Sequence, residues 1–180
     1  MKIMDNFIAN PRSTKDIRNL ADVFRTTFGF DKKGKERFPI MEFIEFAMPR
    51  LDKQFHIEIL EKEVLKNIHG LACPNEHCIQ IRKDVYERAI NGEGRDRFTI
   101  AHEIGHYFMH GQDNVRLARL GELKTVQAYR DPEWQANTFA AELLMPIYLI
   151  DKEDSCFEIA EKFGVSLSAA EIRLKKIYKQ

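Results

Sequence analysis

The pattern of apolar and polar positions predicts a helix near the start of the chain. Ser13 and Asp16 have the spacing of a capping box, so we expect this helix to begin directly after Ser13. Its apolar residues fall on one stripe: Ile17, Leu20, Phe24 and Phe28. Residues 39–51 predict a shorter helix, which should end near Met48 because Pro49 cannot easily continue it.

Two segments in the middle of the chain favour strands. Residues 54–60 alternate apolar and polar side chains, and residues 78–86 place Ile79 and Ile81 on one face. The sequence NGEGR, residues 91–95, predicts a turn.

The second half of the chain is predicted to be helical. A histidine-bearing helix follows the turn, and a charged connection over residues 111–132 leads to a second helix from Glu133 to Met145, which Pro146 ends. Residues 152–179 predict two short helices joined at Gly164. These elements indicate the α+β class: a small, mostly antiparallel sheet packed with the two long helices, and a short helical tail. We expect residues 1–150 to form the main domain and residues 151–180 a helix-turn-helix-like pair packed on it.

The amino-acid composition indicates a folded globular protein. A hydrophobic share of 44%, with 13 Phe, is enough for a buried core in a chain of 180 residues. The 28 basic and 28 acidic residues balance, so no overall charge attracts the chain to nucleic acid or to an anionic membrane. The first residues lack the apolar run of a signal peptide, and no segment reaches the roughly 18 apolar residues of a membrane-spanning helix. We expect a cytoplasmic protein.

The cysteines support that location. Cys73, Cys78 and Cys156 form neither a CxxC pair nor a disulfide framework. Cys73, His77 and Cys78 lie close together, but a zinc knuckle needs a fourth ligand and different spacing. A turn before a strand is the favoured interpretation.

The candidate chemistry lies in the segment FTIAHEIGHYFMH, residues 98–110. His102 and His106 are one helical turn apart, so their imidazoles can bind one metal ion, and Glu103 can reach a metal-bound water without being a ligand. The helix is apolar enough to be buried. Gly105 is unfavourable inside a helix, which predicts the close approach of another element.

His110 is a less suitable ligand. It lies about 12 Å along the axis from His102, too far for the three histidines to share an ion. The extended metzincin pattern is also absent, because Met109 and Gln112 occupy the positions where it requires Gly and His. We interpret His110 as a residue favoured by the dipole at the helix end, or as a substrate contact.

Three glutamates compete to be the third ligand: Glu122, Glu133 and Glu142. In the second long helix the apolar stripe consists of Ala136, Phe139, Ala140 and Leu143. Glu133 flanks this stripe, whereas Glu142 is expected on the opposite, solvent side. Glu122 lies in a charged stretch beside a glycine, so Glu133 is preferred, although its charge could also simply suit the first helical turn. Asn137, one turn later, could hydrogen-bond a ligand histidine.

Two histidines and a carboxylate suit Zn²⁺, and Mn²⁺ or Fe²⁺ could also bind them. With Glu103 as general base, this set best supports peptide hydrolysis. Candidates for contacting the oxyanion or the substrate are Tyr107, His110, Tyr129 and Arg130.

The segments RFTIAHEIGHYFMH and EWQANTFAAELLMP, in this order, resemble the ImmA/IrrE family of metallopeptidases. The resemblance covers roughly residues 57–176. It implies a gluzincin-like minimal peptidase fold with His102, Glu103, His106 and Glu133 in the roles above. It also implies a substrate class, the helix-turn-helix repressors or antitoxins of phage-like elements or stress-response systems.

The tail offers an alternative function. It resembles a helix-turn-helix, so the protein could be a non-hydrolytic, metal-bearing regulator that binds a repressor or DNA through its last two helices. DNA binding is disfavoured because the second helix begins with SLSAA and has its basic residues near the far end. Glu103 favours the enzyme, since a structural metal needs no general base. The sequence does not indicate an oligomeric state.

Overall fold

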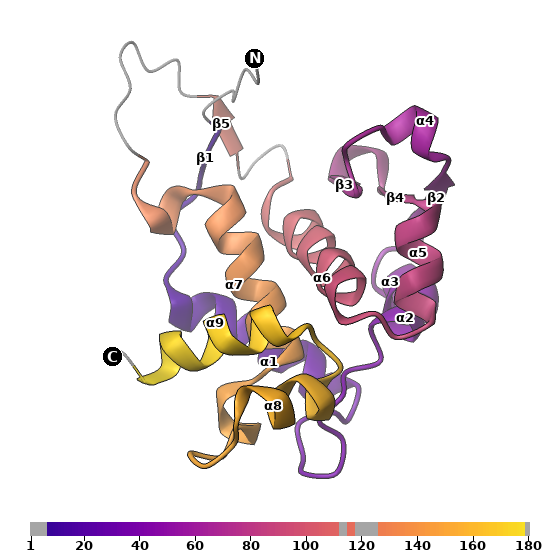
Figure 1. Ribbon diagram of the computed structural model, residues 1–180. Helices are drawn as coiled ribbons and strands as arrows, with labels where there is room; N and C mark the ends of the chain where they lie inside the picture. The colour runs from indigo at the N-terminus through magenta and orange to yellow at the C-terminus, as the bar shows by residue number, and fades with distance from the viewer. Residues whose placement is uncertain (1–6, 112–114, 118–125, 179–180) are drawn as a thin grey trace.

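The computed structural model describes residues 7–111, 115–117 and 126–178 (Figure 1). The strands are β1 (Phe7–Ala9), β2 (His56–Leu60), β3 (Gly70–Cys73), β4 (Cys78–Arg82) and β5 (Val115–Leu117). The helices are α1 (Thr14–Thr27), α2 (Ile40–Glu42), η1 (Phe43–Ala47), α3 (Met48–Leu51), α4 (Lys62–Leu65), η2 (Pro74–Glu76), α5 (Lys83–Ile90), α6 (Gly94–Met109), η4 (Ala128–Arg130), α7 (Pro132–Leu144), η5 (Ile147–Leu149), α8 (Cys156–Phe163) and α9 (Leu167–Tyr178). The predicted α+β class is confirmed.

The first helix begins where its capping box predicts. The Ser13 hydroxyl accepts the Asp16 N–H, and the Asp16 carboxylate accepts the Ser13 N–H in return. Ile17 and Phe24, on the predicted apolar stripe, are buried in the core. This face of α1 packs against α7, and the ring of Phe24 contacts the ring of Phe139.

The predicted end of the second helix near Met48 was wrong. Helical structure continues through α2, η1 and α3 to Leu51. Residues 43–47 form a π turn, and a new α-helical segment starts at Met48. Pro49 therefore occupies the first turn of α3, where the missing N–H has little cost.

The main sheet has the strand order β2-β4-β3 in the described part of the chain. Strand β4 pairs parallel with β2 and antiparallel with β3, and β1 pairs antiparallel with β5 in a separate two-stranded sheet. The strand predicted over residues 78–86 was too long, because β4 ends at Arg82 and residues 83–90 form α5. Strand β3 had not been predicted.

Helices α6 and α7 lie side by side and carry the candidate site between them (Figure 1). Gly105 makes this close approach possible. A Cβ atom at Gly105 would lie 2.9 Å from Cδ1 of Phe139 and 3.3 Å from Cα of Ala136. The prediction that another element closely approaches Gly105 is confirmed.

The prediction that Glu142 faces solvent was wrong. Its exposed fraction is 1%, and its carboxylate accepts hydrogen bonds from the guanidinium groups of Arg18 on α1 and Arg173 on α9. Periodicity identified the apolar face of α7 but not that Arg18 of α1 and Arg173 of α9 meet Glu142 beside it. The ion cluster of Arg18, Glu142 and Arg173 therefore joins α1, α7 and α9.

The two predicted tail helices are present as α8 and α9, with Gly164 between them in the left-handed region at φ 64°. The tail is closely docked. A Cβ atom at Gly94, the first residue of α6, would lie 2.3 Å from the backbone carbon of Val165. The buried Arg97 of α6 donates to the carbonyl oxygen of Gly164. Among the described helices, none has the length and apolar character needed to cross a membrane.

Candidate metal centre

Three side chains from two helices converge at one point. The Nε2 atoms of His102 and His106, one turn apart on α6, lie 2.9 Å apart. The Glu133 carboxylate, in the first turn of α7, lies 3.4 Å from Nε2 of His102 and 3.3 Å from Nε2 of His106. Donor atoms about 2.0–2.1 Å from a tetrahedral zinc ion would be about 3.3 Å apart. The donor set therefore fits a divalent metal ion.

Hydrogen bonds at the Nδ1 atoms of His102 and His106 fix the orientation of the two imidazole rings. The Nδ1 atom of His102 lies 3.1 Å from Oδ1 of Asn137, an acceptor. When Nδ1 of His102 donates to this oxygen, its Nε2 is left with the lone pair that a metal ion would bind.

His106 is oriented by a longer chain of contacts. Gln135 donates its amide hydrogens to the carbonyl oxygens of Asn10 and Tyr129, so its Oε1 accepts from Nε2 of His110. The Nδ1 atoms of His110 and His106 are 2.8 Å apart. A neutral His110 accepts there, so His106 donates from Nδ1 and keeps its own Nε2 lone pair for a metal.

The neutrality of His110 has a physical cause. Burial lowers the pKa of His110 to about 4, although its bond to Gln135 acts in the opposite direction. His110 does lie at the C-terminal end of α6, but its lowered pKa leaves it neutral there, so the helix dipole does not stabilise a charge on it. The residue instead links His106 to the start of α7.

Glu103 is buried beside the two histidines and is held by the neighbouring strand. Its Oε2 accepts the N–H of Ala72 on β3 at 3.0 Å. The backbone of Gly70 also touches it, because a Cβ atom there would lie 2.8 Å from Cγ of Glu103. Burial raises the pKa of Glu103, and the nearby histidines partly oppose this effect. A buried carboxyl with a raised pKa is suited to accepting and returning a proton.

The contact between Glu133 and the two histidines shifts the pKa values of the groups involved. The contacts with His102 and His106 hold the pKa of Glu133 well below its ordinary value. Burial disfavours the charged form of His102, but the Glu133 carboxylate outweighs this effect, so the pKa of His102 is raised. Glu133 is therefore an anion at neutral pH, as a metal-binding carboxylate must be.

Comparison with known protein families agrees with this geometry. The family model described as IrrE N-terminal-like domain, Peptidase_M78, matches residues 53–175. The chain belongs to this family. Membership in Peptidase_M78 supports a metallopeptidase and implies a bound metal ion. Searches of curated proteins and of solved structures gave no significant match.

The other predicted site residues of this Peptidase_M78 family member lie outside the cluster of His102, His106 and Glu133. The Tyr107 hydroxyl donates to Asp52, and its ring is buried against Phe55, so it is directed away from the histidine pair. Tyr129 is exposed on η4, where its hydroxyl donates to Gln127. Arg130, next along η4, is also exposed. Glu122, the rival ligand, and Gln112 lie outside the described residues.

Two features of the site were missed from the sequence. One is the support of Glu103 by β3, and the other is the chain from Gln135 through His110 to His106. Gly70 was a possible signal for the first, because glycine in a strand often marks a close backbone approach. The second depends on a contact between two helices and has no local pattern.

Proposed function

We propose that this protein is a zinc-dependent endopeptidase in which His102, His106 and Glu133 bind the metal and Glu103 is the general base. The observation that carries the proposal is the convergence of the two imidazole Nε2 atoms and the Glu133 carboxylate, with contacts of 2.9, 3.3 and 3.4 Å, beside the buried carboxyl group of Glu103. Family membership supports the metallopeptidase class independently.

A bound zinc ion supplies a water of lowered pKa and polarises the scissile carbonyl. The protein's own residues do the remaining work. Asn137 holds the ring of His102, and His110 holds the ring of His106. With Oε2 fixed by Ala72, Oε1 is the oxygen of Glu103 that we assign to taking a proton and returning it to the leaving amine. Tyr129 and Arg130 are retained as candidate oxyanion or substrate contacts.

A groove beside the metal centre supports a peptide substrate. It has a volume of about 640 Å³ and lies between α6, α7 and α9, with Glu133 and Asn137 on its wall. Its further lining combines apolar and basic side chains: Phe98, Trp134, Ile172, Arg95 and Lys176. A cleft of this size and composition accommodates side chains that flank a scissile bond.

We propose a helix-turn-helix repressor or antitoxin as the substrate, in the cytoplasm and in a phage-like, mobile-element or stress-response system. This substrate class rests on the resemblance of the two motifs to ImmA/IrrE peptidases. The basic residues near the groove also suit a protein partner with acidic or polar segments.

The packing of the tail argues against the DNA-binding alternative. Arg173 is buried in its ion pair with Glu142, and Lys162 pairs with Asp154 at 3.2 Å. Because α9 lines the groove, we propose that residues 151–180 are a wall of the peptidase rather than a separate module.

The test compares metal content with cleavage of the helix-turn-helix regulator encoded nearest to the protein. We expect Glu103→Gln to keep the wild-type metal content and to lose cleavage by at least about 100-fold, the usual contribution of a general base. Glu133→Ala should lose one metal equivalent per chain together with cleavage.

Glu153→Ala is the matched control, because this glutamate is exposed in the segment before α8. It should keep both properties. If Glu133→Ala retains full metal content and cleavage, Glu133 is not the third ligand. If Glu103→Gln cleaves as fast as wild type, the assigned mechanism is wrong.

A further inference from the structure

A second group of metal-binding side chains lies on the main sheet, on residues other than the histidine pair and Glu133. His56 on β2, Cys78 on β4 and Cys73 on β3 form one row, because Cys78 pairs directly with each of the others. Directly paired residues project from the same face of a sheet. Glu58, two residues after His56, lies on this face too.

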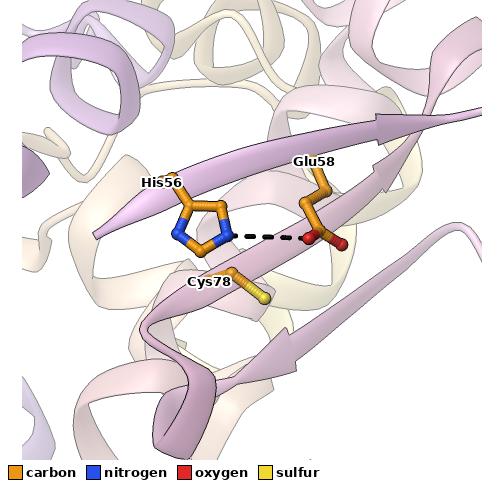
Figure 2. Close-up of side chains that lie close together, drawn as sticks. All are labelled: His56, Glu58 and Cys78. Carbon is orange, nitrogen blue, oxygen red and sulfur yellow. Dashed lines mark ion pairs between the residues drawn. The ribbon is translucent and has the colours of Figure 1, made fainter. Parts of the chain in front are cut away.

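The donor atoms of this row are close together. One donor atom each from His56, Glu58 and Cys78 lies within 4.8 Å of the others, and the same holds for Cys73, Glu76 and Cys78. Figure 2 shows His56 and Glu58 on one strand, with the imidazole facing the carboxylate, and Cys78 beside them on the next strand. Cys78 belongs to both groups and is the centre of the cluster.

Hydrogen bonds already orient two of these side chains. Nδ1 of His56 lies 3.3 Å from the carbonyl oxygen of Gln54, which can only accept, so Nδ1 carries the hydrogen. Nε2 then keeps its lone pair and lies 3.6 Å from Oε1 of Glu58. The other oxygen of Glu58 accepts from the Gln80 amide at 2.8 Å. Partners of this kind hold metal-binding histidines and carboxylates in place.

The site is open to solvent on one side and buried on the other. The side chains of His56 and Glu58 are 53% and 40% exposed, whereas Cys78 is buried. Burial, with the neighbouring Cys73 and Glu58, raises the pKa of the Cys78 thiol to about 12. The Cys78 thiol is therefore protonated until a cation arrives, and metal binding releases its proton to solvent.

We propose that His56, Glu58 and Cys78 form a second, structural zinc site. A thiolate, an imidazole and a carboxylate select zinc over the harder Mg²⁺ and Ca²⁺, which prefer oxygen ligands. Donors around a tetrahedral zinc lie about 3.3–3.8 Å apart, so the side chains need to close in by about 1 Å.

This site would join β2 to β4, the strand with which β3 pairs. Strand β3, at the edge, carries the Gly70 and Ala72 backbone that supports Glu103. Zinc bound between β2 and β4 would stabilise the strand that pairs with β3 and, through it, that support. Because it shares no ligand with the site of the proposed peptidase, it can be tested independently.

Cobalt loading of the reduced protein distinguishes the two sites. A thiolate ligand gives Co²⁺ a strong near-ultraviolet charge-transfer band, and His102, His106 and Glu133 contain no sulfur. We expect wild type to bind two equivalents and to show the band, and Zn²⁺ to abolish it. His102→Ala should lose one equivalent and keep the band, whatever the outcome of the peptidase test.

Cys78→Ser should lose the band and one equivalent, whereas the matched control Cys156→Ser should keep both. Because Cys78 is buried, His56→Asn provides a second test at an exposed position and should weaken cobalt binding at the thiolate site at least about tenfold. One equivalent without the band in wild type, or an unchanged band in Cys78→Ser, would overturn the proposal.

Discussion

Replacing Glu142 by Ala should strongly destabilise the protein, although this residue lies outside the metal centre. The change removes the hydrogen bonds from Arg173 at 2.7 and 2.9 Å and leaves a guanidinium group that is 5% exposed without its counter-ion. Breaking a buried ion pair in this way costs about 3–5 kcal/mol. Arg18 is one-third exposed and can be rehydrated, so most of the loss comes from Arg173.

That loss is a large part of the stability of a domain, which is typically about 5–15 kcal/mol. For 180 residues the unfolding entropy is about 0.38 kcal/mol per kelvin, so the melting temperature should fall by about 8–13 °C. Urea unfolding measures the free energy of unfolding directly, and a chelator in the buffer removes the contribution of bound metal. The exposed control Glu153→Ala should change it by less than about 0.5 kcal/mol.

The pH dependence gives a second test of the same ion cluster. Burial raises the pKa of Glu142, but Arg173 and Arg18 outweigh this effect and leave it below its ordinary value. A carboxyl with a lowered folded-state pKa stabilises the protein above its unfolded-state pKa, about 4.3, and this stability is lost as the pH falls through the folded-state value. The difference between wild type and Glu142→Gln should therefore shrink below about pH 4.

A change of less than 1 kcal/mol for Glu142→Ala would refute the inference that the ion cluster is buried and paired. The double replacement Glu142→Leu with Arg173→Met should recover much of the lost stability, because no buried charge then remains. Failure to recover would attribute the loss to packing rather than to an unpaired charge.

Three further substitutions test the metal centre. Gly105→Ala should destabilise the protein by about 1–3 kcal/mol through overpacking, despite its better helix propensity, and should weaken zinc binding by moving α7; urea unfolding and zinc titration check this. Gly70→Ala should displace Glu103 and lower kcat at least about tenfold while the metal content stays at the wild-type value, because a Cβ would lie 2.8 Å from Cγ of that glutamate. Asn137→Ala should weaken zinc affinity by about 10–100-fold, measured by competition with a chromophoric chelator, and an unchanged affinity would show that its bond to His102 has no orienting role.

Much of the candidate site could be predicted locally. The four-residue spacing of His102 and His106 is a property of any α-helix, so both imidazoles face one point as soon as the segment is helical. The capping box at Ser13 likewise fixes the start of α1 within a few residues. Gly105 indicated a close approach, since little else explains glycine inside a buried helix.

Glu133 was chosen partly on an expectation that the structure contradicts. It was preferred partly because Glu142 was expected in solvent, and Glu142 is instead buried. Periodicity shows which residues of α7 share a face, but it cannot show how many faces other helices cover. Burial of the second face depends on α1 and α9, which are distant in sequence.

By itself the sequence determined α1, α6, α7 and the two tail helices, the histidine spacing and the glycine at the helix contact, because these depend on residues within a few turns. Only the tertiary structure decided which donors meet. It brought His56 to Cys78 across parallel strands, set β3 against Glu103, and joined His110 to Gln135. These contacts depend on how the chain closes on itself, which no local pattern encodes.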